Sequence, residues 1–166
     1  KVLDDPTGPI DKVSPAARDI TVADLFTHAS GLAYNFTAEG ALSKAYDRAL
    51  GSPLANSNGM DGWLKALSTL PLIYQPGDRF HYSHSTDVLG FLVARVDGKT
   101  LGQSLKDRIF DPLGMKDTAF YVPPEKKSRA AGLYGVNAKT DKLERQAWDI
   151  ATRNTPPAFE GGGGGL

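Results

Sequence analysis

The clearest hydrophobic pattern lies in residues 85–98, where apolar and polar positions follow the period of a helix. The apolar side chains recur at i, i+3, i+4 and i+7 and form one predicted buried stripe: Leu89, Leu92, Val93 and Val96. Ser85 or Thr86 is the expected N-cap, because a hydroxyl oxygen accepts hydrogen bonds from the first free backbone N–H groups. Gly98 is expected to end the helix, since glycine readily adopts the left-handed conformation found there.

Helical spacing also occurs in other stretches, at about residues 22–28, 37–50, 61–70 and 101–110. Thr21 precedes Asp24 by three residues, which is the spacing of a capping box at the first of these helices. Thr100 and Gln103 repeat that spacing at the last one. Gly51 is the expected end of the helix over residues 37–50.

Strand patterns are confined to the last third of the chain. Residues 130–136 and 143–148 are predicted strands, and the polar residues 137–142 join them into a β-hairpin. The pattern predicts neither β-α-β alternation nor a closed sheet. The predicted fold class is therefore mainly α with a small β-hairpin.

Composition narrows the classes of function. The 166 residues are enough for one domain with a hydrophobic core. With 19 basic and 19 acidic residues the formal charge is zero, which argues against a nucleic-acid partner, because such proteins usually carry a basic excess. The lack of cysteine excludes disulfides, thiolate metal sites and a cysteine nucleophile. No apolar run reaches the roughly 18 residues of a membrane span, so we expect a soluble protein, with cytoplasm and periplasm both left open.

Polar side chains cluster just before the predicted central helix. Tyr82 and Ser83 would lie at its N-terminus, a place suited to chemistry, although the residues alone favour a packing role for the tyrosine. His81, His84 and Asp87 stand at i, i+3 and i+6, and imidazole and carboxylate are ligands that zinc accepts. The two histidines flank a turn, and no further ligand is evident. We therefore expect no metal and no cofactor.

Four segments resemble the serine β-lactamase-like hydrolases, the superfamily of class C β-lactamases, DD-peptidases and β-lactamase-fold carboxylesterases. Residues 20–32 resemble its ITvrhLLTHTSGL segment, and residues 75–83 resemble PGtrf-YS. Residues 109–118 are similar to iFePLGMkDT, and residues 161–166 resemble the start of GGGGLvST. The match is specific because the segments occur in the family's order and span nearly the whole chain.

The family's nucleophile motif is missing. In the family a serine of an S-x-x-K motif attacks the substrate, and no serine of this chain has a lysine three residues later. The later K-T-G or H-x-G strand is missing too. The resemblance therefore implies the middle of a hydrolase, the helical-domain portion of the β-lactamase and DD-peptidase-like α+β fold. We expect one partial domain over residues 1–166. It would comprise an extended connector (1–19), a helical subdomain (20–120), and a hairpin with a glycine-rich return to a missing α/β domain (121–166).

Tyr82 matches the family tyrosine that works with the S-x-x-K lysine, so the resemblance implies a general base or proton relay. A free phenol has a pKa near 10, and a lysine ammonium beside it would favour the phenolate. That lysine would come from outside the chain. His84 stands where β-lactamases usually have the asparagine of Tyr-x-Asn, which contacts the substrate, and this departure favours the esterase branch. Two alternatives stay open for His84: a substrate contact, or a loop histidine with solvent on one side.

The expected substrate-binding residues are Ser83, His84, Gly162 and Gly163. Glycines at residues 161–165 would let the backbone pass close to an active site. They lack the following Lys-Ser/Thr of a phosphate-binding loop.

The first hypothesis is a piece of a serine hydrolase that cleaves carboxylic esters, or else β-lactams or peptides, through an acyl-enzyme. The parent would be the enzyme, and we expect this chain alone to be inactive. Its partners would be a small-molecule ester or amide substrate and the missing remainder of its own hydrolase fold. The alternative is a non-catalytic helical binding or structural domain of a β-lactamase-like protein. An S-x-x-K motif upstream in the gene would support the hypothesis of a serine hydrolase, and its absence would support the non-catalytic domain.

Overall fold

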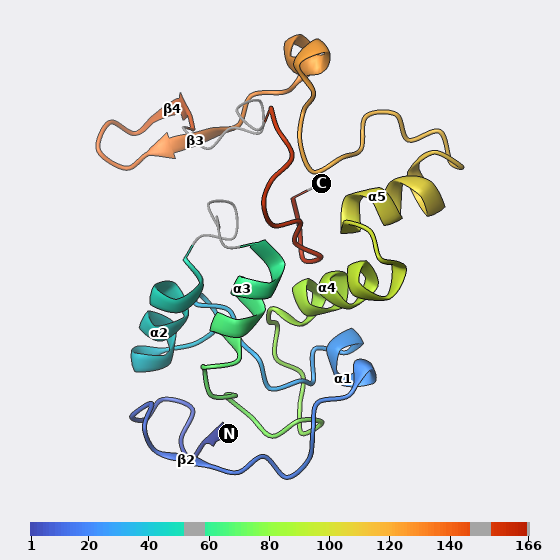
Figure 1. Ribbon diagram of the computed structural model, residues 1–166. Helices are drawn as coiled ribbons and strands as arrows, with labels where there is room; N and C mark the ends of the chain where they lie inside the picture. Colours follow the sequence, from blue (N-terminus) through green and yellow to red (C-terminus); the bar gives the residue numbers. More distant parts are fainter. Residues whose placement is uncertain (52–58, 147–153, 166) are drawn as a thin grey trace. The chain divides into compact units, whose positions relative to one another are not determined.

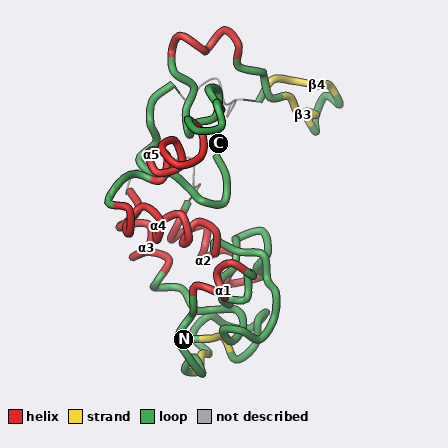
Figure 2. Tube along the Cα trace, turned by 90° about the vertical axis from the view of Figure 1, so that its right-hand side faces the viewer, coloured by secondary structure: helices red, strands yellow, loops and turns green. Residues whose placement is uncertain are grey.

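The computed structural model describes residues 1–51, 59–146 and 154–165. The chain forms two compact units, the first made of residues 1–105 and 158–165 and the second built on residues 106–157. Helices carry most of the regular structure in the described part, and its strands are two to four residues long (Figures 1 and 2). The residues proposed for chemistry all lie in the first unit.

The N-terminal segment forms a packed hairpin in the first unit. β1 (Val2–Leu3) pairs antiparallel with β2 (Val13–Ser14). The N–H of Leu3 donates to the carbonyl of Leu72 at 2.9 Å, and both residues of β1 are buried. Val2 and Leu3 contribute side chains to the hydrophobic core of the first unit.

The predicted capping box at the first helix is confirmed. α1 (Val22–Phe26) begins after Thr21, whose Oγ1 accepts from the N–H of Asp24 at 3.2 Å. In return, the Asp24 carboxylate accepts from the N–H of Thr21 at 2.8 Å. α1 packs against α4 (Ser85–Asp97), the helix predicted at residues 85–98 (Figure 1).

The core of the first unit is built around α2 (Gly40–Leu50) and α3 (Gly59–Leu67), which pack against each other. Their fully buried side chains include Leu42, Tyr46 and Trp63. Phe159 joins them from residues 158–165, with its ring 4.9 Å from that of Trp63. The predicted stop at Gly51 is confirmed, and its N–H donates to the carbonyl of Asp47.

The buried face of α4 is not the predicted one. Val93 and Val96 are 43% and 80% exposed. The buried residues instead are small or polar: Ser85, Asp87, Gly90 and Ala94. Of the predicted stripe, Leu89 packs against the core as a partly buried residue. Gly90 is buried because the glycine-rich segment lies against it: a Cβ on Gly90 would stand 2.9 Å from the Cα of Gly162. Only a small side chain fits such an approach.

The C-terminal end of α4 was predicted correctly and its N-cap was not. Gly98 ends the helix in the left-handed conformation, as expected. The N-cap is His84, and its side chain makes no capping hydrogen bond. The prediction of Ser85 or Thr86 is wrong because both residues already lie within the helix, where the Ser85 hydroxyl bonds to other serines.

The helix predicted at residues 101–110 forms in two parts. α5 (Leu101–Leu105) packs against α4 within the first unit and is followed along the chain by a π-helical turn, η2 (Lys106–Phe110). The Thr100 Oγ1 accepts from the N–H of Gln103 at 3.2 Å, as the capping spacing predicted.

The second unit contains η2, a 3-10 helix η3 (Pro124–Arg129) and the predicted hairpin. β3 (Tyr134–Asn137) pairs antiparallel with β4 (Lys142–Arg145), so the hairpin is confirmed with shorter strands. Residues 147 and 148 of the predicted second strand lie outside the described residues. Arg129 bonds to the Asp117 carboxylate and, with Lys126, lowers the pKa of that group to about 2.

In the described part of the chain no helix has the length and apolar character needed to cross a membrane. The division into a connector, a helical subdomain and a glycine-rich return stays a prediction. So does the assignment to the helical domain of a larger fold.

Candidate functional site

Tyr82 lies at the surface of the first unit, on the segment that leads into α4. Its side chain is 46% exposed, whereas the three residues that follow it are buried. Thr37 Oγ1 donates to the carbonyl of Tyr82 at 2.9 Å and so fixes the backbone of this segment. The Tyr82 ring packs 4.9 Å from the ring of His28 and 5.2 Å from that of Tyr34. A partly exposed tyrosine is thus carried on a backbone that a hydrogen bond holds in place.

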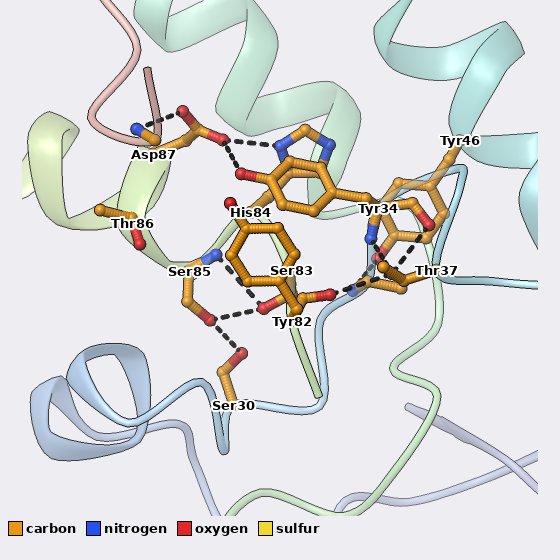
Figure 3. Close-up of polar contacts among 12 residues, drawn as sticks. Ser30, Tyr34, Thr37, Tyr46, Tyr82, Ser83, His84, Ser85, Thr86 and Asp87 are labelled. Atoms are coloured by element: carbon orange, nitrogen blue, oxygen red, sulfur yellow. Dashed lines mark hydrogen bonds and ion pairs between the residues drawn. The ribbon is translucent and has the colours of Figure 1, made fainter. Parts of the chain in front are cut away.

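A chain of buried hydroxyl groups follows Tyr82 (Figure 3). The Ser85 Oγ lies 2.7 Å from the Ser30 Oγ and 2.8 Å from the Ser83 Oγ. The N–H of Ser83 donates to Nδ1 of His28 at 3.2 Å. In neutral His28 the proton then belongs on Nε2, which lies 3.3 Å from the Thr86 Oγ1. These bonds tie the segment before α4 to the turn after α1.

His84 is enclosed by aromatic rings. Its imidazole lies 4.1 Å from the Tyr34 ring, 5.1 Å from Trp63 and 5.9 Å from Tyr46, on which it stacks. Its Nδ1 donates to the Asp87 Oδ2 at 2.8 Å, one helical turn further on. The alternative of a loop histidine with solvent on one side is wrong, because these groups leave only 4% of the residue exposed. Its contact with a substrate stays a prediction.

The glycine-rich residues 161–165 pass close to the first turn of α4. The N–H of Gly163 donates to the Asp87 Oδ1 at 2.9 Å. A Cβ on Gly162 would stand 2.1 Å from the carbonyl oxygen of Thr86, far inside contact distance. Only glycine permits this approach of one backbone to the other.

Tyr34 connects the Asp87 carboxylate to Tyr82. Its hydroxyl donates to the Asp87 Oδ2 at 3.2 Å, as Figure 3 shows. Burial raises the pKa of Tyr34, and the Asp87 charge and an interaction with the Tyr82 hydroxyl raise it further. The Tyr34 phenol therefore stays protonated at neutral pH. Nearby, burial raises the pKa of Tyr46 to about 12, and its oxygen accepts from the N–H of Ala33 at 3.0 Å.

The predicted site residues lie in one part of the first unit, with different exposure. Tyr82 and Gly163 are exposed and Gly162 is half-buried, whereas Ser83 and His84 are buried. A molecule that approaches from solvent would therefore reach Tyr82 and Gly163 before Ser83 or His84. The roles of all five residues stay predictions.

The sequence did not reveal three members of this network. Ser30 and His28 fall inside the family-like segment at residues 20–32, which was the only available signal for them. Tyr34 stands 48 residues before Tyr82, and no local spacing links it to Tyr82 or to Asp87. Only the folded chain brings these side chains together.

The three residues weighed as zinc ligands do not form one cluster. His84 and Asp87 bond to each other, but the His81 side chain packs 5.4 Å from the Tyr74 ring. Burial lowers the pKa of His81, and its Nε2 has no hydrogen-bond partner among the described residues. Within residues 1–51, 59–146 and 154–165 no group of three acidic or histidine side chains could hold a metal ion.

Comparison with known families covers nearly the whole chain. The model of the beta-lactamase family matches residues 3–166. The chain belongs to the beta-lactamase family. The family-like segments read from the sequence therefore identified it correctly.

Two relatives of this beta-lactamase family chain show how much of a longer protein it matches. Protein Rv1367c of Mycobacterium tuberculosis is 46% identical over 167 residues, which cover 99% of this chain and 39% of that protein. Lovastatin esterase of Penicillium rubens is 35% identical over 133 residues, which cover 80% of this chain and 31% of that protein. The chain thus spans less than half the length of either relative.

The fold agrees with this family. The solved structure of EstCE1, a hydrolase with promiscuous acyltransferase activity, superimposes with a TM-score of 0.75 at 24% sequence identity. The match covers 96% of this chain and 44% of that one. The beta-lactamase family chain therefore has the fold of the corresponding part of EstCE1, a partial α+β domain.

Proposed function

We propose that the protein is a serine hydrolase that cleaves small carboxylic esters through an acyl-enzyme, and that this chain supplies its tyrosine. The observation that carries the proposal is the placement of Tyr82. Its side chain is 46% exposed, while the Thr37 hydroxyl holds its backbone and buried hydrogen bonds hold the serines that follow. A catalytic side chain needs this combination of access and fixed position.

The reaction needs groups that the 166 residues do not contain. A serine from an S-x-x-K motif would attack the ester carbonyl carbon while Tyr82 accepts the proton of its hydroxyl. The alkoxide would leave with a proton returned by Tyr82, and water would then release the acid from the serine. A lysine ammonium beside Tyr82 would favour its phenolate. Backbone N–H groups would stabilise the oxyanion of each tetrahedral intermediate.

An ester is the proposed substrate for two reasons. His84 replaces the asparagine that the resemblance assigns to contact with β-lactam substrates, and its Nδ1 is already bonded to Asp87. In addition, the relative from Penicillium rubens is named an esterase and matches 80% of the chain. Ser83, His84, Gly162 and Gly163 would shape the wall around Tyr82.

The test uses the complete product of the gene that encodes this chain. We expect it to hydrolyse p-nitrophenyl butyrate, and Tyr82→Phe to lower kcat roughly 10²–10⁴-fold, the usual contribution of a general base. Because p-nitrophenolate leaves without a proton, this substrate isolates the activation of the serine. The matched control is Tyr134→Phe, which alters an exposed tyrosine of β3 in the second unit.

Two results would overturn the proposal. One is a kcat of Tyr82→Phe equal to that of the Tyr134→Phe control. The other is the absence of an S-x-x-K serine from the gene product, which would favour the non-catalytic binding domain. The 166 residues alone are expected to show no turnover above buffer.

A further inference from the structure

Three segments that are distant in sequence meet at the carboxylate of Asp87. Its Oδ1 accepts from the N–H of Gly163 at 2.9 Å. Its Oδ2 accepts from Nδ1 of His84 at 2.8 Å and from the hydroxyl of Tyr34 at 3.2 Å. The residue is buried, so these three donors take the place of water around the carboxylate.

The glycine-rich residues 161–163 lie so close to this carboxylate and to Tyr34 that added side chains would collide with them. A Cβ on Gly161 would stand 2.9 Å from the Asp87 Oδ1, and one on Gly163 would stand 2.7 Å from the Tyr34 hydroxyl. By contrast, a Cβ on Gly164 would have no atom of the described residues within 4 Å. The close fit is therefore confined to the glycines that face Asp87 and α4.

The Asp87 carboxylate also fixes the position of Tyr34, whose ring packs against that of Tyr82. Tyr34 is held at its hydroxyl by Asp87 and at its N–H by Thr37, whose Oγ1 accepts at 2.8 Å. The Tyr82 ring lies 5.2 Å from the Tyr34 ring, and the Thr37 hydroxyl also donates to the Tyr82 carbonyl. A displaced Tyr34 would therefore remove one of the rings that hold Tyr82 and leave it packed against His28.

We propose that Asp87 is a positioning residue, which holds residues 161–163 and Tyr34 so that the Tyr82 hydroxyl keeps one place at the entrance of the site. The inference rests on the proposed function, because it is Tyr82 that would act on the substrate. Asp87 is buried and acts only through its neighbours.

The structural part of the test needs no catalysis. In the complete gene product, Asp87→Ala removes the acceptor of Gly163, and we expect amide exchange in residues 159–165 to become at least about tenfold faster. We also expect the nuclear Overhauser effects between the Tyr34 and Tyr82 rings to be lost. Asp87→Asn keeps one carbonyl oxygen and should change both signals less. Leu42→Ala is the control, because it removes a fully buried core side chain of α2 that takes no part in the hydrogen bonds of Asp87.

The kinetic part of the test compares kcat and KM of the parent, Asp87→Asn, Asp87→Ala and Leu42→Ala. All four proteins are assayed well below the melting temperature of the least stable one. We expect kcat for p-nitrophenyl butyrate to fall roughly tenfold in Asp87→Asn and roughly hundredfold in Asp87→Ala, since small misplacements of reacting groups lower rates by such factors. KM is measured alongside kcat, because Asp87 also holds His84 and Gly163, which are proposed to shape the substrate wall. Leu42→Ala should keep the kcat of the parent, which separates positioning from general stability.

The outcomes separate this inference from the proposed function. An unchanged kcat in Asp87→Ala, or a reduced kcat with unchanged exchange at residues 159–165, overturns the positioning role. If Asp87→Ala does not fold, Asp87→Asn decides by the same criteria. If the protein hydrolyses no ester, the proposed function fails. The ring contacts of Tyr34 and Tyr82 then decide whether Asp87 fixes Tyr82, and retained contacts overturn that role.

Discussion

The N–H of Gly163 donates to the Asp87 carboxylate across 76 residues of sequence, and this bond holds the glycine-rich segment against α4. Neither part of the chain has a sequence pattern that predicts this contact. The segment can come this close only because its residues have no side chain.

The first prediction concerns Gly162. In Gly162→Ala the new Cβ would stand 2.1 Å from the Thr86 carbonyl oxygen, so the segment has to move away from α4. We expect a loss of about 3 kcal/mol or more in the free energy of unfolding, at the upper end for overpacking. Gly164→Ala is the matched control, because its Cβ meets nothing within 4 Å. Equal chemical denaturation midpoints for the two variants would contradict the close approach.

The second prediction concerns the buried serines. Ser85→Ala removes the hydroxyl that bonds to both Ser30 and Ser83 and leaves two buried oxygens with one partner fewer. We expect the free energy of unfolding to fall by about 1–3 kcal/mol. Ser68→Ala deletes an exposed hydroxyl at the end of α3 and should change stability by less than about 0.5 kcal/mol. Urea denaturation of both variants measures the difference, and a Ser85→Ala value as small as the control would count against the network.

The third prediction is a pH dependence of stability from Asp24. Arg18 donates to both of its oxygens, at 2.6 Å and 2.9 Å, and with Thr21 holds the pKa of Asp24 well below its usual range. The folded state therefore binds fewer protons than the unfolded state, whose Asp pKa is about 3.9. This contribution is fully present above pH 4 and is lost as the pH falls toward the lower folded-state pKa.

Arg18→Gln removes the main cause of that shift. The melting temperature of the variant should fall less steeply than that of the parent between about pH 4 and pH 2. Arg48→Gln changes an exposed arginine whose Nε donates to a backbone carbonyl in α2, so its pH profile should follow the parent. Parallel profiles for Arg18→Gln and the parent would show that Asp24 is not held in this way.

The fourth prediction compares two glycines to separate the stability cost of a positive φ from that of steric crowding. Gly31 and Gly98 both have positive φ, at 79° and 66°, and in each an L side chain costs about 1–2 kcal/mol. A Cβ on Gly31 would also stand 2.1 Å from the Tyr74 carbonyl oxygen, whereas nothing lies within 4 Å of one on Gly98. Gly31→Ala should therefore destabilise the protein clearly more than Gly98→Ala in thermal unfolding. A similar loss in both would mean that the Gly31 turn has room to adjust.

Features set by neighbours along the chain could be predicted from the sequence. The Thr21–Asp24 capping box and the stops at Gly51 and Gly98 depend on residues within a few positions of each other, and the β3–β4 hairpin depends on residues at most 11 positions apart. The family was also recognisable, because its segments occur in order along the chain. The position of Tyr82 before the helix made it a candidate, and only the resemblance gave it a catalytic role.

The buried face of α4 and the network around Tyr82 were decided by the tertiary structure. The apolar stripe predicted to be buried leaves Val96 exposed, whereas Asp87 and Gly90 are buried where the glycine-rich segment lies against α4. His84 became a buried partner of Asp87, since rings from distant elements close around it. Periodicity measures how side chains are spaced along one helix. It carries no information on which distant backbone will lie against that helix, and this contact determines the site.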